Sequence, residues 1–250
     1  MKNSILHIKN LKKAYYTLKK ETLAVNNFSM ELHRGEFIAV VGPSGCGKST
    51  ILSILCGLED KTEGEIFYHN QKIGYMLQTD ALFDWLTILD NCLLGLKIKK
   101  ELTEEKKEYV LSLLKKYGLS DFVNSYPNHL SGGMRQRVAL IRTLATKPDI
   151  LLMDEPFSAL DYQSRLAISD DVFKILKEEK KSLIMVTHDI AEAISMCDKV
   201  IVLSERPCTV KKVFDISLTN KSNPIENRKA KEFADYYEKI WKEIDYEQRT

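Results

Sequence analysis

The residues whose types and spacing most clearly imply chemistry lie between positions 42 and 50, which read GPSGCGKST. They match the pattern G-x-x-x-x-G-K-[ST], in which small residues let backbone N–H groups converge on a phosphate. Lys48 adds an ammonium for the β- and γ-phosphates of a nucleotide, and Ser49 offers a hydroxyl to Mg²⁺. The sequence therefore predicts a site for ATP and Mg²⁺ built by the whole loop: Gly42, Pro43, Ser44, Gly45, Cys46, Gly47, Lys48, Ser49 and Thr50.

Two adjacent carboxylates, Asp154 and Glu155, follow the apolar run at 150–153. Two acids at the end of a buried strand are costly unless a cation or water occupies the position. We expect Asp154 to belong to the Mg²⁺ shell and Glu155 to polarise or deprotonate the attacking water. An Asp-Glu pair alone more often begins a solvated loop, but a phosphate loop in the same chain favours hydrolysis.

The elements that must position these residues follow from apolar patterning. The run at 37–41 stops at a glycine and predicts a buried strand, and 48–57 has helical composition with Gly57 as its stop. Alternating strands and helices are typical of a parallel sheet with crossover helices. Further strands are predicted at 150–153, 183–186 and 200–203, and further helices at 162–179 and 190–197.

Other segments have weaker patterns. We expect short strands at 4–9 and 22–32, and a hairpin formed by 66–68 and 73–77. Residues 85–145 are helical in pattern, with one helix capped by Thr103 and ended by Gly118. A last amphipathic helix is predicted at 229–246. We expect its apolar and aromatic face to pack on the core, with partner binding as the alternative: Phe233, Tyr236, Tyr237, Ile240, Trp241 and Ile244.

The segment LSGGMRQR at 130–137 precedes the acidic strand, and this combination resembles the ATP-binding cassette (ABC) ATPases. The resemblance extends from residue 4 to about 205. It implies an α/β fold with a P-loop NTPase core, which is a mostly parallel sheet with flanking helices, plus a small antiparallel β subdomain and an inserted α-helical subdomain. The implied organisation is 1–82 and 146–210 for the core, 83–145 for the helical subdomain and 211–250 for a C-terminal extension.

The same resemblance implies roles for residues outside the loop. Ser131, Gly132 and Gly133 cap a helix, and in this family such a helix tip completes the ATP site of a second copy, so we expect a homodimer. The other implied roles are Gln78 sensing Mg²⁺ and water, His188 contacting the γ-phosphate, Asp161 crossing the dimer interface, and Tyr15, with Tyr16 as its rival, stacking on adenine. The plainer alternatives are a surface glutamine, a structural histidine, a helix cap and strand-surface tyrosines.

Finer resemblance points to importers. Segments 78–87, 186–194 and 202–207 are similar to nitrate, sulfonate and taurine importer ATPases, although Asp84, Ile141, Thr143 and a short 64–78 segment depart from that subgroup. Importer relatives act on integral membrane permeases, and indirectly on an extracytoplasmic solute-binding protein, from the cytoplasmic face of the cell membrane. We expect Phe83, Trp85 and Leu86 to contact the permease or, alternatively, to pack the insert. Other subunits recognise the cargo.

Composition limits the rival classes. The 37 basic and 35 acidic residues nearly cancel, so no nucleic-acid partner is expected. A soluble ABC ATPase acting on ribosomes or DNA is the main alternative, but such proteins commonly carry two cassettes, long coiled coils or basic arms. A small-molecule kinase is disfavoured by the 130–137 segment. No signal peptide and no run of about 18 apolar residues is seen, so a membrane role requires a partner.

The five cysteines form no C-x-x-C pair, which favours reduced thiols in a cytosolic protein. Only Cys46 lies in the phosphate loop. Thiol reagents could block nucleotide binding there, or Cys46 could simply be a small side chain that the loop tolerates.

Overall fold

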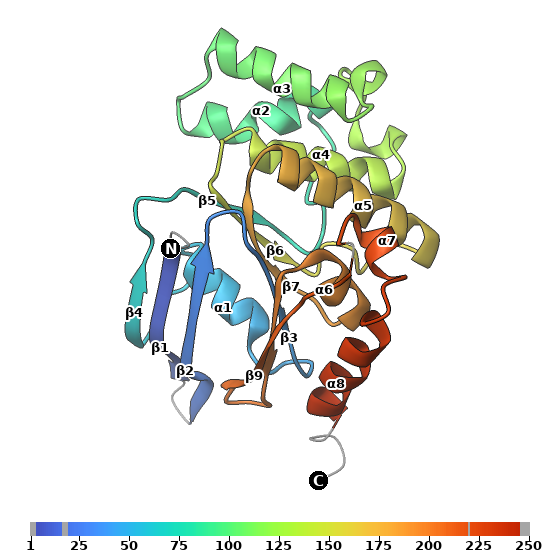
Figure 1. The fold of residues 1–250 in the computed structure, drawn as a ribbon. Helices are drawn as coiled ribbons and strands as arrows, with labels where there is room; N and C mark the ends of the chain where they lie inside the picture. Colours follow the sequence, from blue (N-terminus) through green and yellow to red (C-terminus); the bar gives the residue numbers. More distant parts are fainter. Residues whose placement is uncertain (1–3, 17–19, 220, 246–250) are drawn as a thin grey trace.

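The computed structural model describes residues 4–16, 20–219 and 221–245. Its centre is a six-stranded sheet with the order β5-β6-β7-β3-β8-β9, in which the first five strands are parallel and β9 is antiparallel (Figure 1). Every residue of β3, β6 and β7 is buried, as expected for parallel strands covered on both faces. The strands are β3 (Phe37–Val41), β5 (Ile73–Met76), β6 (Ile150–Asp154), β7 (Ser182–Val186), β8 (Lys199–Leu203) and β9 (Val210–Asp215).

A separate three-stranded antiparallel sheet, β2-β1-β4, consists of β1 (Ser4–Tyr16), β2 (Glu21–His33) and β4 (Glu63–Phe67). The hairpin expected from 66–68 and 73–77 is therefore wrong. β4 pairs with β1, whereas β5 joins the central sheet beside β6. His69 and Asn70 between them both have positive φ and redirect the chain, and a turn pattern alone does not reveal that each strand has a better partner elsewhere.

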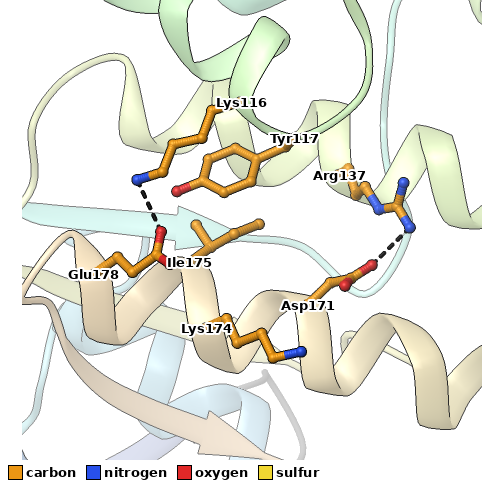
Figure 2. Close-up of a pocket in the computed structure, with 7 residues that line it drawn as sticks. All are labelled: Lys116, Tyr117, Arg137, Asp171, Lys174, Ile175 and Glu178. Carbon is orange, nitrogen blue, oxygen red and sulfur yellow. Dashed lines mark hydrogen bonds and ion pairs between the residues drawn. The ribbon is translucent and has the colours of Figure 1, made fainter.

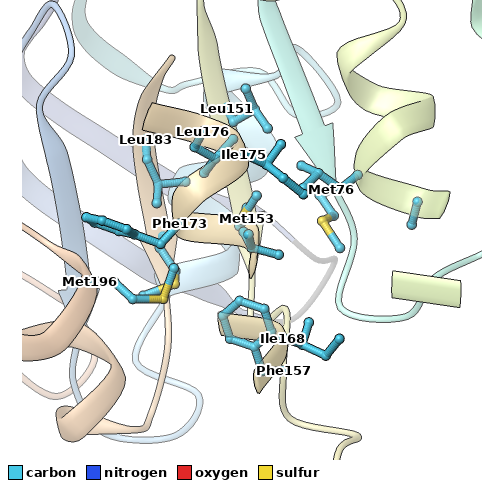
Figure 3. Packing of buried hydrophobic residues seen from close by; sticks show 14 of the residues in the cluster. Met76, Leu151, Met153, Phe157, Ile168, Phe173, Ile175, Leu176, Leu183 and Met196 are labelled. Atoms are coloured by element: carbon cyan, nitrogen blue, oxygen red, sulfur yellow. The ribbon is translucent and has the colours of Figure 1, made fainter. Parts of the chain in front are cut away.

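The central sheet separates two apolar clusters. Along β3, Phe37, Ala39 and Val41 face one cluster, and Ile38 and Val40 face the other, because side chains alternate along a strand. The first cluster includes α5 (Tyr162–Glu178) and α6 (Ile190–Met196), and Figure 3 shows part of this packing around β6. The second cluster joins α1 (Lys48–Leu55) to the antiparallel sheet.

The predicted helical insert contains α2 (Ile88–Ile98), α3 (Glu104–Lys116) and α4 (Gly132–Leu144), with short 3₁₀ turns at Ser120–Phe122 and Pro127–His129. Thr103 caps α3 by accepting a hydrogen bond from the Lys106 amide, and Gly118, with a φ of 75°, follows the helix as its expected stop. α4 packs against α2, α3 and α5, so it connects the insert to the core. The α/β fold with an antiparallel subdomain and a helical insert is confirmed.

The C-terminal part adds β9, which the sequence patterns did not reveal, and α7 (Pro224–Asn227) and α8 (Phe233–Asp245). The apolar and aromatic face of α8 is partly buried and partly exposed. Ile240 is fully buried and Phe233 packs on the core, whereas Tyr237 and Trp241 are exposed and their rings stack at 6.3 Å. Within the described ranges, no helix has the length and apolar character needed to cross a membrane.

Candidate nucleotide-binding site

The candidate site lies where four neighbouring parallel strands end. Gln78 comes shortly after β5, Glu155 directly after β6, His188 after β7, and the phosphate loop directly after β3. These strands are adjacent in the order β5-β6-β7-β3. Because the carboxyl ends of parallel strands share one edge, four distant sequence segments converge there, and this edge is the usual ligand position in open α/β sheets.

The phosphate loop depends on glycine at two positions. Gly45 and Gly47 have φ of 73° and 131°, which side chains disfavour. A Cβ on Gly47 would lie 3.0 Å from the Ala24 carbonyl oxygen and 3.1 Å from Cys208 Sγ. Gly47 is also the N-cap of α1 and makes no side-chain cap, so the first amides of the helix stay available for a phosphate.

Lys48 is only 7% exposed, and its ammonium donates to the carbonyl oxygens of Gly42 at 2.9 Å and Pro43 at 2.8 Å. The loop itself thus holds the ammonium beside a cavity of about 240 Å³. A buried cation with neutral partners attracts a polyanion strongly. The cavity is lined by Ser44, Gly45, Gly47, Lys48, Ser49, Thr50, Glu155 and Arg206.

Asp154 lies beside the loop and is 8% exposed. Its Oδ1 accepts from Ser49 Oγ at 3.2 Å, and its Oδ2 accepts from the Tyr75 hydroxyl at 3.4 Å. Burial raises the pKa of Asp154, and the neighbouring Glu155 raises it further, against hydrogen bonds from Ser49 and Tyr75 that lower it. A nearby cation would therefore relieve the cost of keeping this carboxylate ionised.

A hydroxyl and one carboxylate fit the coordination of Mg²⁺, which takes oxygen ligands and commonly binds through one or two carboxylates together with substrate phosphates. In the part of the chain that the structure describes, no group of three or more His, Cys, Asp or Glu side chains is placed to hold a metal. Ser49 and Asp154 would hold the ion together with the phosphates of a nucleotide.

Glu155 is the point where the other candidate residues meet. Its Oε2 lies 3.3 Å from Gln78 Nε2 and 3.1 Å from His188 Nδ1. Its φ is +45°, uncommon for a residue with a side chain, and its amide donates to the Val186 carbonyl at 2.8 Å. The backbone thus aims the carboxylate at the site, and the structure brings Gln78, Glu155 and His188 together, while their roles in hydrolysis stay predictions.

Ser131, Gly132 and Gly133 lie outside the loop cavity, at the N-terminus of α4. Ser131 is exposed and its Oγ accepts from the Met134 amide at 3.4 Å, so it is the expected cap. A Cβ on Gly133 would lie 2.8 Å from Ile168 Cδ1, which explains the glycine by the close packing of α4 on α5.

Asp161 and the two tyrosines of β1 keep more than one interpretation. Asp161 is exposed and caps α5 by accepting from the Ser164 amide at 3.0 Å, and this hydrogen bonding lowers its pKa. It is therefore a helix cap, and its interface role stays a prediction. Tyr15 and Tyr16 on β1 are 36% and 69% exposed, so both rings remain candidates for stacking. Cys46 is 2% exposed, which favours the small, packed side chain over a reactive thiol.

The sequence patterns did not reveal Arg206. Its Nη2 donates to the Gly45 carbonyl oxygen at 2.7 Å, and it lines the loop cavity. The turn that carries it is fixed to β2, because the Cys208 amide donates to the Ala24 carbonyl at 3.0 Å. A single arginine in a turn has no sequence signal for this position, since the contact spans 161 residues.

A second cavity, of about 290 Å³, lies between α5 and the helical insert (Figure 2). Lys116 on α3 pairs with Glu178 at 2.8 Å, and Arg137 on α4 pairs with Asp171 at 2.6 Å. Both acids are on α5, so the ion pairs join the insert to the core. These cations already have carboxylate partners, which favours a structural joint over a ligand site.

The chain is similar in sequence and fold to known proteins over most of its length. A family model described as "ABC transporter" matches residues 25–158. The chain is 46% identical to the uncharacterized ABC transporter ATP-binding protein YtlC of Bacillus subtilis (strain 168), over 97% of this chain and 96% of that protein. It is 35% identical to an aliphatic sulfonates import ATP-binding protein SsuB of Bacillus cereus, over 93% of both chains.

Among solved structures, the chain is similar to a dimeric post-hydrolysis state of the ATP-binding cassette MJ0796 bound to ADP and Pi. The TM-score is 0.72 and the identity is 33%, over 85% of this chain and 99% of that one.

Proposed function

The chain belongs to the ABC transporter family and is an ATP-binding, ATP-hydrolysing subunit, and from this premise we propose that two copies enclose ATP to drive import of a small solute. The observation that carries the proposal is the separation of two anion-binding elements. The phosphate loop lines a cavity and carries the positive charge of Lys48. The tip of α4 lies outside that cavity and is exposed. A second copy would bring the two together across a two-fold axis.

Each residue would then act as follows. Lys48 and the loop amides neutralise the phosphate charge, and Glu155 with His188 and Gln78 orients the attacking water. Mg²⁺, held by Ser49 and Asp154, would supply positive charge beside the phosphates. Loss of the γ-phosphate removes the bridge between the copies, so the pair opens after hydrolysis.

A mechanical connection joins this chemistry to the helical insert. Downstream of Gln78, the carbonyl oxygens of Asp80 and Ala81 each accept from Arg142 on α4 at 2.6 Å. The Asp80 carboxylate also pairs with Arg135 of α4 at 2.9 Å. Movement at Gln78 would therefore reach α4 through these two arginines, without passing through the core.

The loop after Ala81 presents apolar side chains to solvent. Trp85 is 73% exposed and Phe83 37%, and their rings lie 4.9 Å apart. The fully buried Asn91 holds this loop by donating to the carbonyls of Phe83, Leu86 and Thr87 at 3.0–3.1 Å, and by accepting from the Phe83 amide at 2.8 Å. A rigid loop with an exposed aromatic pair suits a partner's apolar helix.

We assign this surface to the permease, because it follows directly on the segment that carries Gln78. The protein would then work at the cytoplasmic face of the membrane, as a peripheral subunit. SsuB is by its name an ATP-binding protein for import of aliphatic sulfonates, which supports import of a small organic solute. An extracytoplasmic solute-binding protein would select the cargo.

The dimer is tested with Glu155→Gln, which keeps the shape of the site and removes the base. We expect hydrolysis to fall about 10³-fold while ATP and Mg²⁺ convert the variant to a dimer in light scattering. Glu155→Gln combined with Ser131→Arg is the matched control and should stay monomeric. A Glu155→Gln chain that is monomeric at saturating ATP would contradict the proposal.

Permease docking is tested with Trp85→Ala and, as the matched control, Trp241→Ala, which removes the exposed tryptophan of α8 (51% exposed). Each variant is co-expressed with the integral membrane protein that co-purifies with the unsubstituted chain. Trp85→Ala should lose most of its membrane association and retain its hydrolysis rate in detergent-free buffer. Equal retention by both variants would refute docking at this loop.

The alternative is an ABC ATPase that acts on ribosomes or DNA. The near balance of 37 basic and 35 acidic residues argues against a large basic surface. The same co-expression experiment separates the two, because the alternative requires nuclease-sensitive sedimentation with ribosomes or DNA in both tryptophan variants.

A further inference from the structure

A cluster of charged side chains lies behind His188. Arg165 of α5 places Nη1 3.3 Å from Asp189 Oδ2 and Nε 3.8 Å from Glu192 Oε1. The side chains of Arg165, Asp189 and Glu192 are only 22%, 24% and 3% exposed. Ion pairs of such low exposure are screened less than surface pairs and hold their partners in defined positions.

Arg165 also reaches a second loop. Its Nη2 donates to the carbonyl oxygen of Leu160 at 3.0 Å. Leu160 precedes Asp161, the residue expected at the interface between the two copies. One planar guanidinium therefore holds the 158–161 segment and the Asp189 carboxylate at once, which a lysine ammonium cannot do with the same geometry.

On the other side of the cluster, the backbone around His188 is fixed to Asp189. The Asp189 amide donates to Thr187 Oγ1 at 3.0 Å, and Thr187 Oγ1 donates to Glu192 Oε2 at 2.9 Å. Asp189 Oδ1 caps α6 by accepting from the Glu192 amide at 3.1 Å. A shift of the Asp189 carboxylate must therefore move the residues on both sides of His188.

We propose that Arg165 is a positioning residue that links the 158–161 segment to His188, so that hydrolysis responds to occupation of the interface by the second copy. The inference rests on the proposed dimer. When the interface shifts the Leu160 carbonyl, the guanidinium carries the shift to Asp189 and turns the imidazole, which lies 3.1 Å from Glu155. Small displacements of a catalytic group change rates strongly.

The electrostatics of the cluster predict a pH dependence of kcat that a purely structural role of Arg165 would not produce. Burial and Asp189 raise the pKa of Glu192 to about 7, while the Thr187 hydroxyl, Arg165 and Arg228 oppose the shift. Ionised Glu192 attracts Arg165, so the linkage is complete above this pKa and weakens as pH falls through it. Removing Arg165 raises the pKa of Glu192 further, and neutralising Asp189 lowers it.

The test compares Arg165→Met, Arg165→Lys and Asp189→Asn with Lys174→Met, a control further along α5 whose ion pair is to Asp170. Arg165→Met should lower kcat about 10-fold with ATP affinity and melting temperature close to those of the control. Arg165→Lys should be intermediate. The acidic limb of the kcat profile that comes from Glu192 should be absent in Arg165→Met, which has no guanidinium for Glu192 to attract, and should move to lower pH in Asp189→Asn, which retains the helix cap.

Failure of this inference differs from failure of the dimer. ATP should still dimerise the Glu155→Gln chain when Arg165→Met is added. If Glu155→Gln stays monomeric both with and without Arg165→Met, the proposal of a site shared between two copies is refuted. If the double variant dimerises and Arg165→Met turns over like Lys174→Met, or the acidic limbs coincide, the role of Arg165 is refuted. Parallel losses of kcat and ATP affinity would also refute it, and Asp189→Asn decides the case if Arg165→Met does not fold.

Discussion

The N-termini of α1 and α4 both have glycine at the cap or in the first turn, but the two helix ends offer a ligand different groups. At α1, the buried Lys48 stands beside uncapped amides in a cavity of about 240 Å³. At α4, the Ser131 hydroxyl already accepts a hydrogen bond from the Met134 amide, and the serine is exposed. Under the proposed function, one helix end binds the phosphates within its own chain and the other completes the site of the second copy.

The difference indicates which helix end supplies affinity for phosphate and which contributes only after the ligand is bound. A buried cation and converging amides bind phosphate in a single chain. An exposed tip with only backbone and hydroxyl donors binds weakly on its own, and it contributes when a ligand is already held opposite it. The following experiments test this division.

Replacing Lys48 by Ala should have the largest effect on binding. We expect the affinity of the monomer for ATP to fall about 100-fold, because the ammonium makes charge-assisted bonds in a buried site. Ser131→Ala should change monomer affinity less than about twofold. Titration with a fluorescent ATP analogue below the dimerisation concentration checks both, and equal losses would break the distinction between the two helix ends.

Mixing two inactive variants should restore activity. Lys48→Ala damages the loop and Ser131→Arg damages the α4 tip, so a mixed dimer has one site with both defects and one intact site. Random mixing at equal amounts then restores roughly a quarter of the intact sites, well above either variant alone. Phosphate release measured against mixing ratio checks this, and a sum of the two separate rates would exclude shared sites.

Alanine substitutions at Gly47 and Gly133 should differ in their effect on the free energy of unfolding. Gly47→Ala combines a disfavoured φ with a clash against the Ala24 carbonyl, so the free energy of unfolding should fall by about 2–4 kcal/mol. At Gly133 the clash is with the end of the Ile168 side chain, and alanine favours the helix, so the change should stay within about 1 kcal/mol. Urea unfolding measures both, and the reverse order would contradict the geometry.

Removing Arg206 should have the smallest effect. Arg206→Ala takes one cation from the rim of the loop cavity and one hydrogen bond from Gly45, so ATP affinity should fall about three- to fivefold. Arg206→Lys retains the charge and should recover part of that affinity. If Arg206→Ala affected only melting temperature, its role would be to brace the loop.

The sequence predicted where the candidate site residues lie relative to the strands better than it predicted which strands pair. Spacing and apolar runs placed the phosphate loop, Asp154, Glu155 and His188 after buried strands, because strand ends of one parallel sheet must share an edge. The pairing of β4 and β5 was predicted wrongly, since turn residues indicate where a chain bends but not which strand it meets.

Residues whose role depends on distant contacts were also missed. Arg206 meets the phosphate loop across 161 positions, and Asn91 gains its role from three carbonyls of a neighbouring loop. Arg165 lies within the helix predicted at 162–179, and no pattern there indicates its contacts with Leu160 and Asp189. Such side chains carry no local pattern, because their partners are brought together only by folding.

The backbone of Glu155 has a consequence for the evolution of this chain. A left-handed conformation costs a residue with a side chain about 1–2 kcal/mol, and asparagine tolerates it better than glutamate. Glu155→Asn should therefore melt at a higher temperature while losing turnover. Selection for thermal robustness alone would not retain the acid at this position, which fits the proposed role of Glu155 in hydrolysis.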